Sequence, residues 1–412
     1  MQQPRHDVAI IGGGLVGASL AIALDRIGRD VALVEAAPPG APPAVFDERN
    51  LSFAEATVHG LRALGVLQKL RAPVGPIRRI HVTRAGDFGR VVLDAAEHGR
   101  EQFGQVVVAR DFGQALEERL SECTHVTRYR PMRFEGTHAG DGVRTLQLRD
   151  ADGAERRVDA RLLVGADGTR SGVREALGIG ADDHDFLQTL FVARVRAERA
   201  PDGTAYERFG PHGPTALLPR GDGHFGVVHG VPRDEADAVA ALDDREFLAR
   251  VQDAFGWRVG RFLSCGPRSA YPIVQVVARA LVGERAALVG NAAQTLHPIG
   301  AQGFNLGLRD ALTLAELIEA ADDPGAAALL AEHARRRRED RAETLQFSGG
   351  LARLTANGGE GMRPLRSMAF AAIERLPALR AQLIGGALGY RGEVPRLCRG
   401  YVGQGHVGQE RA

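Results

Sequence analysis

Three separate segments of the chain are rich in glycine and stand beside acidic or amide side chains. They are residues 12–17, residues 165–168 and residues 290–305. Glycine lets the backbone pass close to a phosphate or a flat ring, and neighbouring acids and amides can form hydrogen bonds to it. The order and spacing of these segments predict that distant parts of the chain hold one long dinucleotide.

The first segment has the G-x-G-x-x-G spacing of a dinucleotide-binding turn. The apolar run 7–11 predicts a buried parallel strand before the turn, and a helix is expected from about residue 15 to residue 27. The first glycine permits the tight turn, the second lets backbone approach a pyrophosphate, and the third lets the helix sit close to the strand. The expected cofactor contacts are Gly12, Gly14, Leu15, Val16 and Gly17.

An acidic residue follows the next predicted strand. Glu35 ends the run 30–34 and lies 18 residues after Gly17, where a carboxylate can accept both ribose hydroxyls of an adenosine. An acid at this place also argues against a 2′-phosphate. Strand, glycine turn, helix and acid together favour a dinucleotide site over an ordinary glycine-rich turn.

The second segment places an acid at the end of another buried strand. Residues 161–164 predict the strand, Asp167 lies between two glycines, and Ser171 can cap a helix that starts there. One interpretation is that Asp167 approaches the pyrophosphate or a second, transient dinucleotide. The other is a plain Asp-Gly turn at a strand end, and the sequence leaves both open.

The third segment repeats this order of a strand, a glycine with a polar residue, and a helix. A strand at 286–289 leads to Gly290 and Asn291, and a helix is expected to open after Gly303. The N-terminus of that helix offers free N–H groups and positive potential, which suit an electron-rich ring edge. The backbone could pass close to a flat ring at Pro298, Gly300 and Gly303.

Composition excludes several other classes of protein. The 412 residues are 44% hydrophobic and 25% charged with a net charge of +1, so a soluble globular protein is expected and nucleic acid is not an expected partner. The three cysteines form no C-x-x-C pair, and no metal site is predicted. No apolar run approaches the ~18 residues of a membrane span, and no signal peptide is visible. We therefore expect a cytoplasmic protein, with peripheral contact at the inner face of a membrane left open.

The pattern of strands and helices predicts an α/β fold: a Rossmann-like FAD-binding domain with an inserted β-sheet domain and a helical C-terminal region. Residues 53–71 and most of 306–390 look helical, and the run Arg335–Arg338 is expected on a solvated helix face. The expected boundaries are 1–75, 100–180 and 280–345 for the discontinuous FAD-binding domain, 76–99 and 181–279 for the substrate-binding sheet, and 346–412 for the helical region.

Together, these segments resemble the flavin monooxygenase superfamily typified by para-hydroxybenzoate hydroxylase. The run 290–299, GNAAQTLHPI, is similar in particular to the ubiquinone-biosynthesis hydroxylases such as 2-octaprenyl-6-methoxyphenol hydroxylase. Asn291 fits that branch, whereas the wider family has Asp at this place. Ala301 departs from it, because the branch usually reads A-G-Q-G where this chain has GAQG.

The resemblance implies roles for further residues. Arg49 and Arg110 match arginines that contact FAD, Gln105 is a candidate flavin contact, and Asp167 matches the family's Asp-Gly acid. The expected flavin-ring loop comprises Gly290, Asn291, Pro298, Gly300, Gly303, Phe304 and Asn305.

The resemblance also implies a reaction. FAD would be reduced by NAD(P)H as a transient reductant and would react with O₂ to a C4a-hydroperoxide that hydroxylates a polyprenylated phenol. No residue identifies itself as the base for the phenol, so the catalytic residues are left unassigned. Four side chains in plausible regions, for which core or loop roles are expected, are Tyr206, His224, His229 and His297.

Two alternatives remain open. One is an FAD-dependent reductase of a prenyl lipid with the same fold, and the other is a non-enzymatic carrier of prenylated partners, against which the flavin-ring segment argues. The apolar residues and arginines of 362–388 predict a helix pair packed on the body, or else a surface for a membrane or a ubiquinone-biosynthesis complex.

Overall fold

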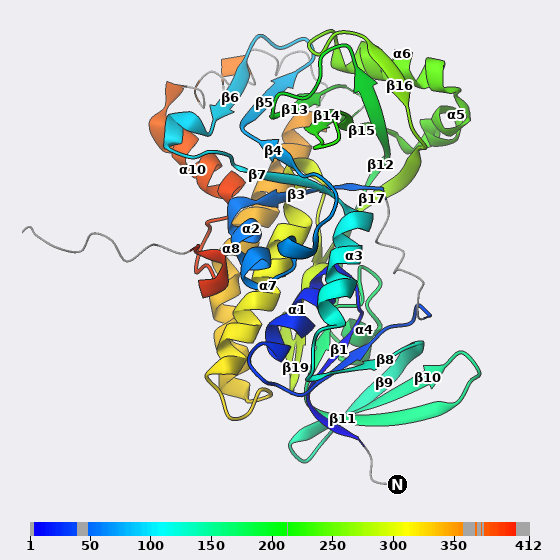
Figure 1. Cartoon of the computed structure of the whole chain (residues 1–412), viewed down its shortest axis with the longest axis vertical. Helices are drawn as coiled ribbons and strands as arrows, with labels where there is room; N and C mark the ends of the chain where they lie inside the picture. Colours follow the sequence, from blue (N-terminus) through cyan, green and yellow to red (C-terminus); the bar gives the residue numbers. More distant parts are fainter. Residues whose placement is uncertain are drawn as a thin grey trace, which may run out of the picture.

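Two large sheets lie at opposite ends of the molecule, with helices filling the space between and beside them (Figure 1). The computed structural model describes residues 4–38, 48–211, 213–356, 367–368, 372 and 375–400. The predicted α/β class is confirmed, because a parallel Rossmann-like sheet is combined with antiparallel sheets.

The first sheet has a parallel core in the order β19-β11-β1-β2-β8. The central strands β1, β2 and β19 and the second half of β11 are largely buried and apolar, because helices or a hairpin cover both faces of the sheet. The antiparallel strands β18, β9 and β10 extend it. The bounds are β1 Arg5–Ile11, β2 Val31–Val34, β8 Val126–Tyr129, β9 Met132–Gly140, β10 Val143–Asp150, β11 Glu155–Gly165, β18 Val282–Gly283 and β19 Ala286–Leu288.

Three helices pack on one face of this sheet and share its main hydrophobic core. They are α1 Leu15–Asp25, α3 Ala109–Leu120 and α7 Gln302–Glu319. The first helix follows the glycine turn directly, as expected from the sequence, and ends two residues earlier than expected. The short helix α4 Gly172–Ala176 lies by the other face near β9.

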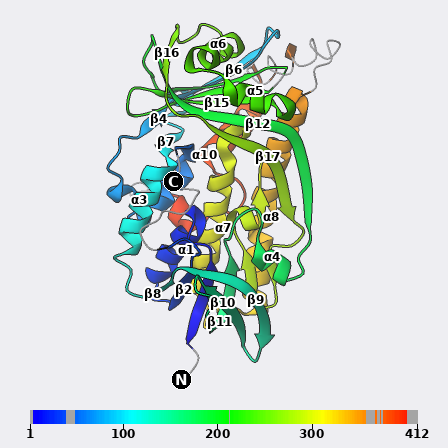
Figure 2. The same cartoon turned by 90° about the vertical axis from the view of Figure 1, so that its right-hand side faces the viewer.

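The second sheet has nine strands, and its long strands β12 and β17 reach back toward the parallel sheet (Figure 2). Its order is β20-β17-β12-β15-β14-β13-β5-β6, with β16 beside β12. Helix α6 Asp244–Phe255 covers one face together with α5 Ala236–Ala241. The bounds are β5 Arg79–Arg84, β6 Arg90–Asp94, β12 Ala181–Ala197, β13 Thr204–Phe209, β14 Pro214–Pro219, β15 Phe225–Pro232, β16 Phe262–Cys265, β17 Ser269–Ala278 and β20 Gln294–Thr295.

A small antiparallel sheet connects the two halves, in the order β3-β7-β4. Its strands are β3 Asn50–Ala54, β7 Gly104–Val108 and β4 Gly75–Ile77. The expectation of helix throughout 53–71 is wrong at its start, because Phe53 and Ala54 form the end of β3 and pair with β7. Helix α2 spans only Glu55–Ala63. Strand pairing outweighs local helix preference here.

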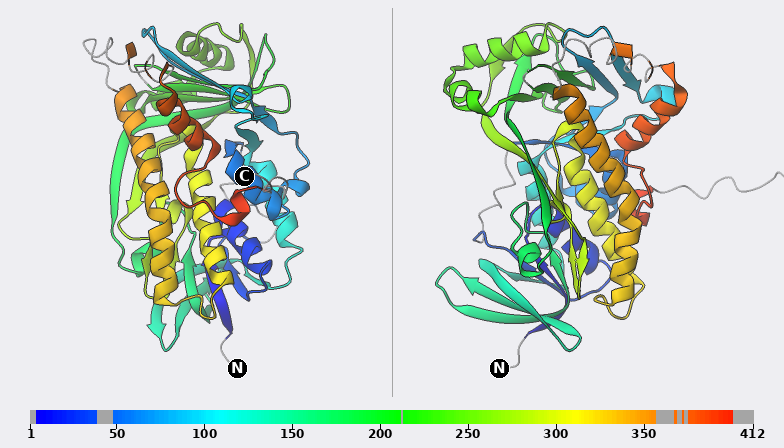
Figure 3. Two further views of the ribbon diagram at one scale, coloured as in Figure 1. Left: turned by 90° about the vertical axis from the view of Figure 1, so that its left-hand side faces the viewer. Right: turned by 180° about the vertical axis from the view of Figure 1, so that it is seen from behind.

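Helices α7 and α8 lie side by side along the molecule, and α10 crosses near the second sheet (Figure 3). Helix α8 spans Ala327–Ala356 and α10 spans Pro377–Leu388. The expected solvated arginine run is half wrong: Arg335 is exposed, whereas Arg336 and Arg337 are buried. The cause is a pair of carboxylates, Asp310 and Asp340, that meets Arg337 inside the helix pair. Among the described residues, no helix is both long and apolar enough to cross a membrane.

Candidate active site

The three glycine-rich segments follow the carboxyl ends of adjacent parallel strands. Ile11 of β1 is in register with Gly165 of β11, and Gly165 is in register with Leu288 of β19. The chain therefore leaves all three strands at the same edge of the sheet. This edge is where parallel α/β sheets bind dinucleotides.

Close backbone contacts join the segments to one another. Gly12 has φ +104°, and a Cβ on it would lie 2.5 Å from the carbonyl oxygen of Ala166. A Cβ on Gly17 would overlap the carbonyl oxygen of Gly12, so the helix can approach the turn only with glycine there. A Cβ on Gly290 would lie 3.1 Å from the Val16 side chain, so the third segment contacts the first.

Glu35 lies beside the glycine turn, as its position after β2 requires. Its two carboxylate oxygens accept the N–H groups of Gly13 and Ala37, each at 2.8 Å. A carboxylate has about four lone-pair sites, so capacity remains for two ribose hydroxyls. These backbone bonds fix the acid at the sheet edge.

Asp167 has one oxygen committed and one left over. Oδ2 accepts the N–H of Val173 at 3.0 Å, which ties the Asp-Gly turn to the start of α4. Oδ1 is buried and has no hydrogen-bond partner within the described part of the chain. The expected cap is present, since the Ser171 hydroxyl accepts the N–H of Arg174 at 2.9 Å. The orphaned oxygen suits a hydroxyl donor of a bound cofactor.

The third segment ends in a tight turn before α7. This helix begins at Gln302, slightly earlier than expected, after a 3₁₀ turn, η5, at Ile299–Ala301. Gly300 and Ala301 both have left-handed backbone, with φ of +72° and +52°. No side chain caps the N-terminus of α7, and nothing lies within 4 Å of the place where a Cβ on Gly303 would sit. The first N–H groups of an α-helix have no partner within the helix, so they can bind a ligand there.

Two residues of the predicted ring loop brace it from behind. The Asn305 side chain accepts the N–H of Ala54 at 3.0 Å and donates to the carbonyl oxygens of Ser52 and Ala301. Phe304 packs against the rings of Phe53 and Phe112. The amide of Asn305 is thus committed to protein groups. The exposed members of the loop are Asn291, Pro298 and Gly300.

The predicted residues outside the three segments lie on or beside the small sheet. Gln105 is half-buried in β7, where its backbone pairs with Phe53 and Pro76. The Arg49 guanidinium lies 4.8 Å from the centre of the Tyr271 ring, a contact from the nine-stranded sheet that the sequence did not indicate. Arg110 is half-exposed at the start of α3.

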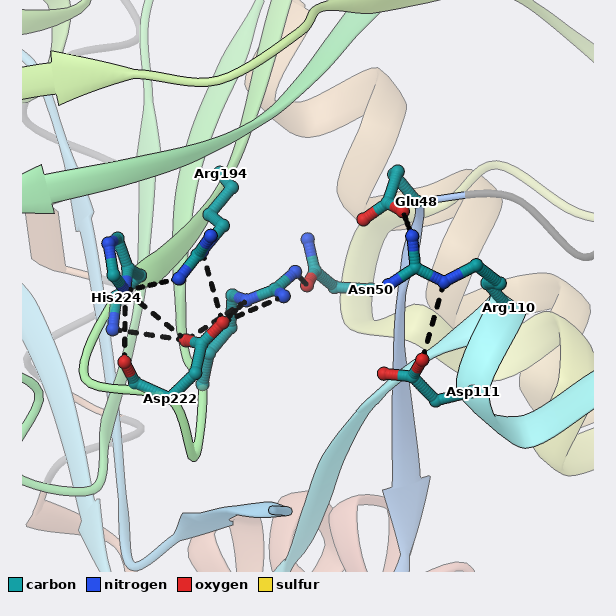
Figure 4. A network of polar contacts seen from close by, with 8 residues as sticks. Glu48, Asn50, Arg110, Asp111, Arg194, Asp222 and His224 are labelled. Carbon is teal, nitrogen blue, oxygen red and sulfur yellow. Dashed lines mark hydrogen bonds and ion pairs between the residues drawn. The ribbon is translucent and has the colours of Figure 1, made fainter. Parts of the chain in front are cut away.

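Arg110 pairs with Glu48 and Asp111 at one end of the polar network in Figure 4. At the other end, the Asp222 carboxylate lies within ion-pair distance of Arg194, Arg220 and His224. Arg220 also donates to the side-chain oxygen of Asn50 at 3.0 Å, which links the nine-stranded sheet to β3.

Sequence reasoning also missed the ion network behind the ring loop. Gln294, in the third segment, donates to Asp310 at 2.6 Å, and Arg341 donates to the oxygen of Gln294 at 2.8 Å. Asp310 is bound in turn by Arg337. The sequence did offer one signal: polar Gln294 stands among apolar residues. A buried amide there would need a hydrogen-bond partner from another part of the chain.

The four side chains considered as bases have structural roles. The Tyr206 ring packs edge-on against Phe255 of α6, and Nδ1 of His224 forms a hydrogen bond with the backbone carbonyl oxygen of Asp222. His229 bonds Thr215 and His297 accepts the N–H of Ile299, and burial lowers the pKa of each imidazole to about 4. Both histidines are therefore neutral at physiological pH.

The residues at the sheet edge fit an FAD. The turn at 12–17 and Glu35 suit its adenosine diphosphate, and the orphaned Asp167 oxygen suits a hydroxyl of its middle part. The uncapped start of α7, with open space at Gly303, suits the polar edge of a flavin ring.

Comparisons with known proteins agree with this geometry. Residues 5–348 match the family described as FAD binding domain. The chain is 36% identical over 408 residues to the ubiquinone hydroxylase UbiL of Rhodospirillum rubrum, covering 96% of this chain and 92% of that protein. It is 30% identical to the 3-demethoxyubiquinol 3-hydroxylase of Escherichia coli, and the match covers 94% of this chain and 100% of that protein.

The fold is also that of p-nitrophenol 4-monooxygenase PnpA from Pseudomonas putida, with a TM-score of 0.78 at 19% identity over 95% of this chain and 99% of that one. The predicted family, the cofactor FAD and the enzyme class are thus confirmed. The chain belongs to the FAD-binding aromatic monooxygenases of the para-hydroxybenzoate hydroxylase type and, within them, to the hydroxylases of ubiquinone biosynthesis.

Proposed function

We propose that this chain hydroxylates the ring of a polyprenylated phenol in ubiquinone biosynthesis, with NAD(P)H as reductant and O₂ as the source of oxygen. One contact carries the proposal: Ile299, in the ring loop before α7, packs against Phe209 of the nine-stranded sheet. The loop that suits a flavin ring and the face of that sheet therefore border the same region. The names of the two curated relatives support a ubiquinone precursor as the substrate.

Each part of the site then has a task. Gly12, Gly14 and Glu35 hold the adenosine end of FAD, Arg49 and Arg110 bind its phosphate or ribityl oxygens, and the start of α7 orients the ring. FAD, when bound, supplies the redox chemistry between NAD(P)H, O₂ and the substrate. The protein binds and aligns the phenol and excludes water from the reacting atoms.

The direct test is turnover with labelled oxygen. Purified protein is supplied with FAD, NADH or NADPH, ¹⁸O₂ and a phenol carrying a short prenyl chain. We expect one ¹⁸O atom in the product and NAD(P)H oxidation that depends on the phenol. Reduction of the prenyl chain without oxygen uptake would instead indicate a prenyl-lipid reductase, and a colourless protein that binds prenyl groups would indicate a carrier.

The substrate class has an independent test in cells. In cells that lack the gene, we expect a prenylated methoxyphenol to accumulate and the quinone to disappear. Restoring the wild-type gene reverses both changes. An unchanged quinone profile contradicts the proposed place in ubiquinone biosynthesis.

We further propose a cytoplasmic protein with peripheral contact at the inner face of the membrane, because the substrate is a lipid. Met368 and Leu376 are 62% and 51% exposed, and Arg375, which precedes Leu376, is exposed as well. Apolar and basic side chains together favour an anionic bilayer surface. Helix α10, in the same stretch, packs on the body through Ile384 and Leu388. Residues 362–366, 369–371 and 373–374 lie outside the described part of the chain.

Flotation with liposomes that contain anionic lipid tests this contact. We expect a fraction of the wild-type protein to float and the double variant Met368→Glu/Leu376→Glu to stay in the dense fractions. Equal flotation of the two proteins contradicts membrane contact through this surface.

A further inference from the structure

One carboxyl group lies in an apolar row on the nine-stranded sheet. Residues opposite one another on five adjacent strands form this row, because Glu207 pairs with Val82 and with Ala216, and the pairing continues through Val228 to Val192. Side chains at paired positions point to the same face of a sheet. Glu207 is therefore the one acid in a row that is otherwise aliphatic.

This row faces the ring loop. Side chains alternate along a strand, so Glu207 shares its face with Phe209, which packs against Ile299 of the loop. Tyr206, on the opposite face, packs against Phe255 of α6, with the ring centres 5.6 Å apart. The carboxyl group of Glu207 consequently points to the flavin side of the sheet, away from α6.

The surroundings of Glu207 are apolar but not closed. Glu207 and Val228 are half-buried although they belong to central strands of the sheet, so packing leaves space over this part of the face. Within the described part of the chain, no hydrogen bond or ion pair engages the Glu207 carboxyl. Burial among apolar groups raises its pKa to about 7.

Two arginines on elements around this face are already paired. Arg84, on β5 next to Phe209, pairs with Asp87 at 3.8 Å. Arg380, on α10, pairs with Glu97 at 2.7 Å. Strand β14, on the other side of β13, carries no charged side chain. Thus neither flanking strand offers Glu207 a free cation, and its carboxyl remains available to a ligand.

We propose that Glu207 accepts the hydrogen bond and then the proton of the substrate's phenol hydroxyl. The inference deepens the proposed function and rests on it. As an electrophilic oxygen attacks the ring, the phenol O–H bond breaks, the proton forms an O–H bond on the Glu207 carboxylate, and the electron pair that stays on the oxygen enriches the ring. The attacked ring carbon then loses its hydrogen as a proton to water, the ring regains aromaticity, and Glu207 returns its proton to the ring oxygen. The aliphatic residues of the row hold the ring by contact alone.

A group with these properties is suited to the task. A general base works best when its pKa is near the operating pH, and a phenol in water has a pKa of about 10, so an acid of ordinary pKa would be too weak a base. The same apolar row that raises the pKa of Glu207 also keeps water from competing for the phenol.

The test compares Glu207→Gln with wild type. Glu198→Gln serves as the matched control, since Glu198 follows β12 directly, is half-exposed, and contacts the backbone N–H of Arg261 at 2.9 Å and its guanidinium at 3.9 Å. A short-chain 2-prenylphenol is titrated against the oxidised, FAD-loaded protein between about pH 6 and pH 8, and the flavin difference spectrum reports binding. We expect the wild type and the control to bind the phenol more tightly as Glu207 ionises, because the carboxylate accepts the hydrogen bond of the phenol, and we expect the affinity of Glu207→Gln not to change with pH over this range. In turnover, kcat should fall by about 10²- to 10³-fold in Glu207→Gln with KM within about threefold.

The outcomes separate the two proposals. A pH dependence of binding and a kcat in Glu207→Gln that match the wild type within about threefold overturn the role of Glu207 while leaving the hydroxylase intact. Wild-type protein that makes no hydroxylated product overturns the proposed function, and the binding titration, which needs no turnover, still judges Glu207. The visible flavin spectrum checks folding, and Glu207→Asp, which keeps a carboxylate, should recover part of kcat if the role is chemical.

Discussion

Two arginine–carboxylate networks flank the site, and they differ in burial. Behind the ring loop, Arg309, Arg337 and Asp340 are fully buried between α7 and α8. At the start of α3, Arg110 and Glu48 are each about half-exposed (Figure 4). A buried ion pair is costly to break, whereas an exposed pair contributes little to stability and can exchange partners. The first network is thus suited to hold the loop and the second to receive an anionic ligand.

The largest effect should come from breaking the buried network. Asp340→Asn removes the charge that faces two buried guanidinium groups, and we expect the free energy of unfolding to fall by about 3–5 kcal/mol. Urea unfolding followed by circular dichroism measures it. The control Asp323→Asn acts on the partly exposed pair with Arg285 and should cost about 1 kcal/mol or less. Equal losses in the two variants would mean that burial does not distinguish these networks.

The same carboxylate predicts a dependence on pH. Burial by itself would raise the pKa of Asp340, but the Arg309 and Arg337 guanidiniums outweigh it and lower the pKa from 3.8 to about 2. The stabilisation is therefore complete above pH 3.8 and is lost as the pH falls toward 2, because the unfolded chain takes up the proton first. We expect a loss of roughly 2 kcal/mol across this window. Asp340→Asn should flatten that part of the stability profile; an unchanged profile contradicts the assignment.

Two asparagines of the ring segment allow a comparison between a residue that supports the loop and a residue that is expected to bind FAD. Asn305→Ala leaves the buried N–H of Ala54 without its acceptor and should cost about 1–3 kcal/mol of stability. Asn291→Ala, at an exposed position, should leave stability nearly unchanged and weaken FAD binding instead. Thermal unfolding of the FAD-free protein and fluorescence titration with FAD separate the effects. Loss of stability in Asn291→Ala would assign that residue to the scaffold.

The smallest effect is expected at Ala301. Its φ of +52° is costly for a residue with a Cβ, and glycine removes that cost while adding freedom to the unfolded chain. We expect Ala301→Gly to raise the free energy of unfolding by up to about 1 kcal/mol. Destabilisation by this variant would show that the Ala301 methyl group makes contacts that outweigh the backbone strain.

The sequence was most informative where one short segment carries its own geometry. The glycine turn, Glu35 and the strand ends at Asp167 and Gly290 are local patterns, and parallel strands bring their ends to one edge. Long-range pairing was not visible in the same way. The burial of Arg337 depends on Asp310 of another helix, and the place of Glu207 depends on the register of five strands. Neither follows from the residues next to it.

The central claim is that the segments around Gly12, Asp167 and Asn291 hold one FAD. Titration of the FAD-free protein with FAD, followed by the visible spectrum and by calorimetry, tests it most directly. The account predicts a yellow complex with one FAD per chain, weakened strongly in Gly12→Val, whose side chain would enter the backbone at Ala166. A protein that stays colourless and releases no heat of binding at any FAD concentration would contradict it.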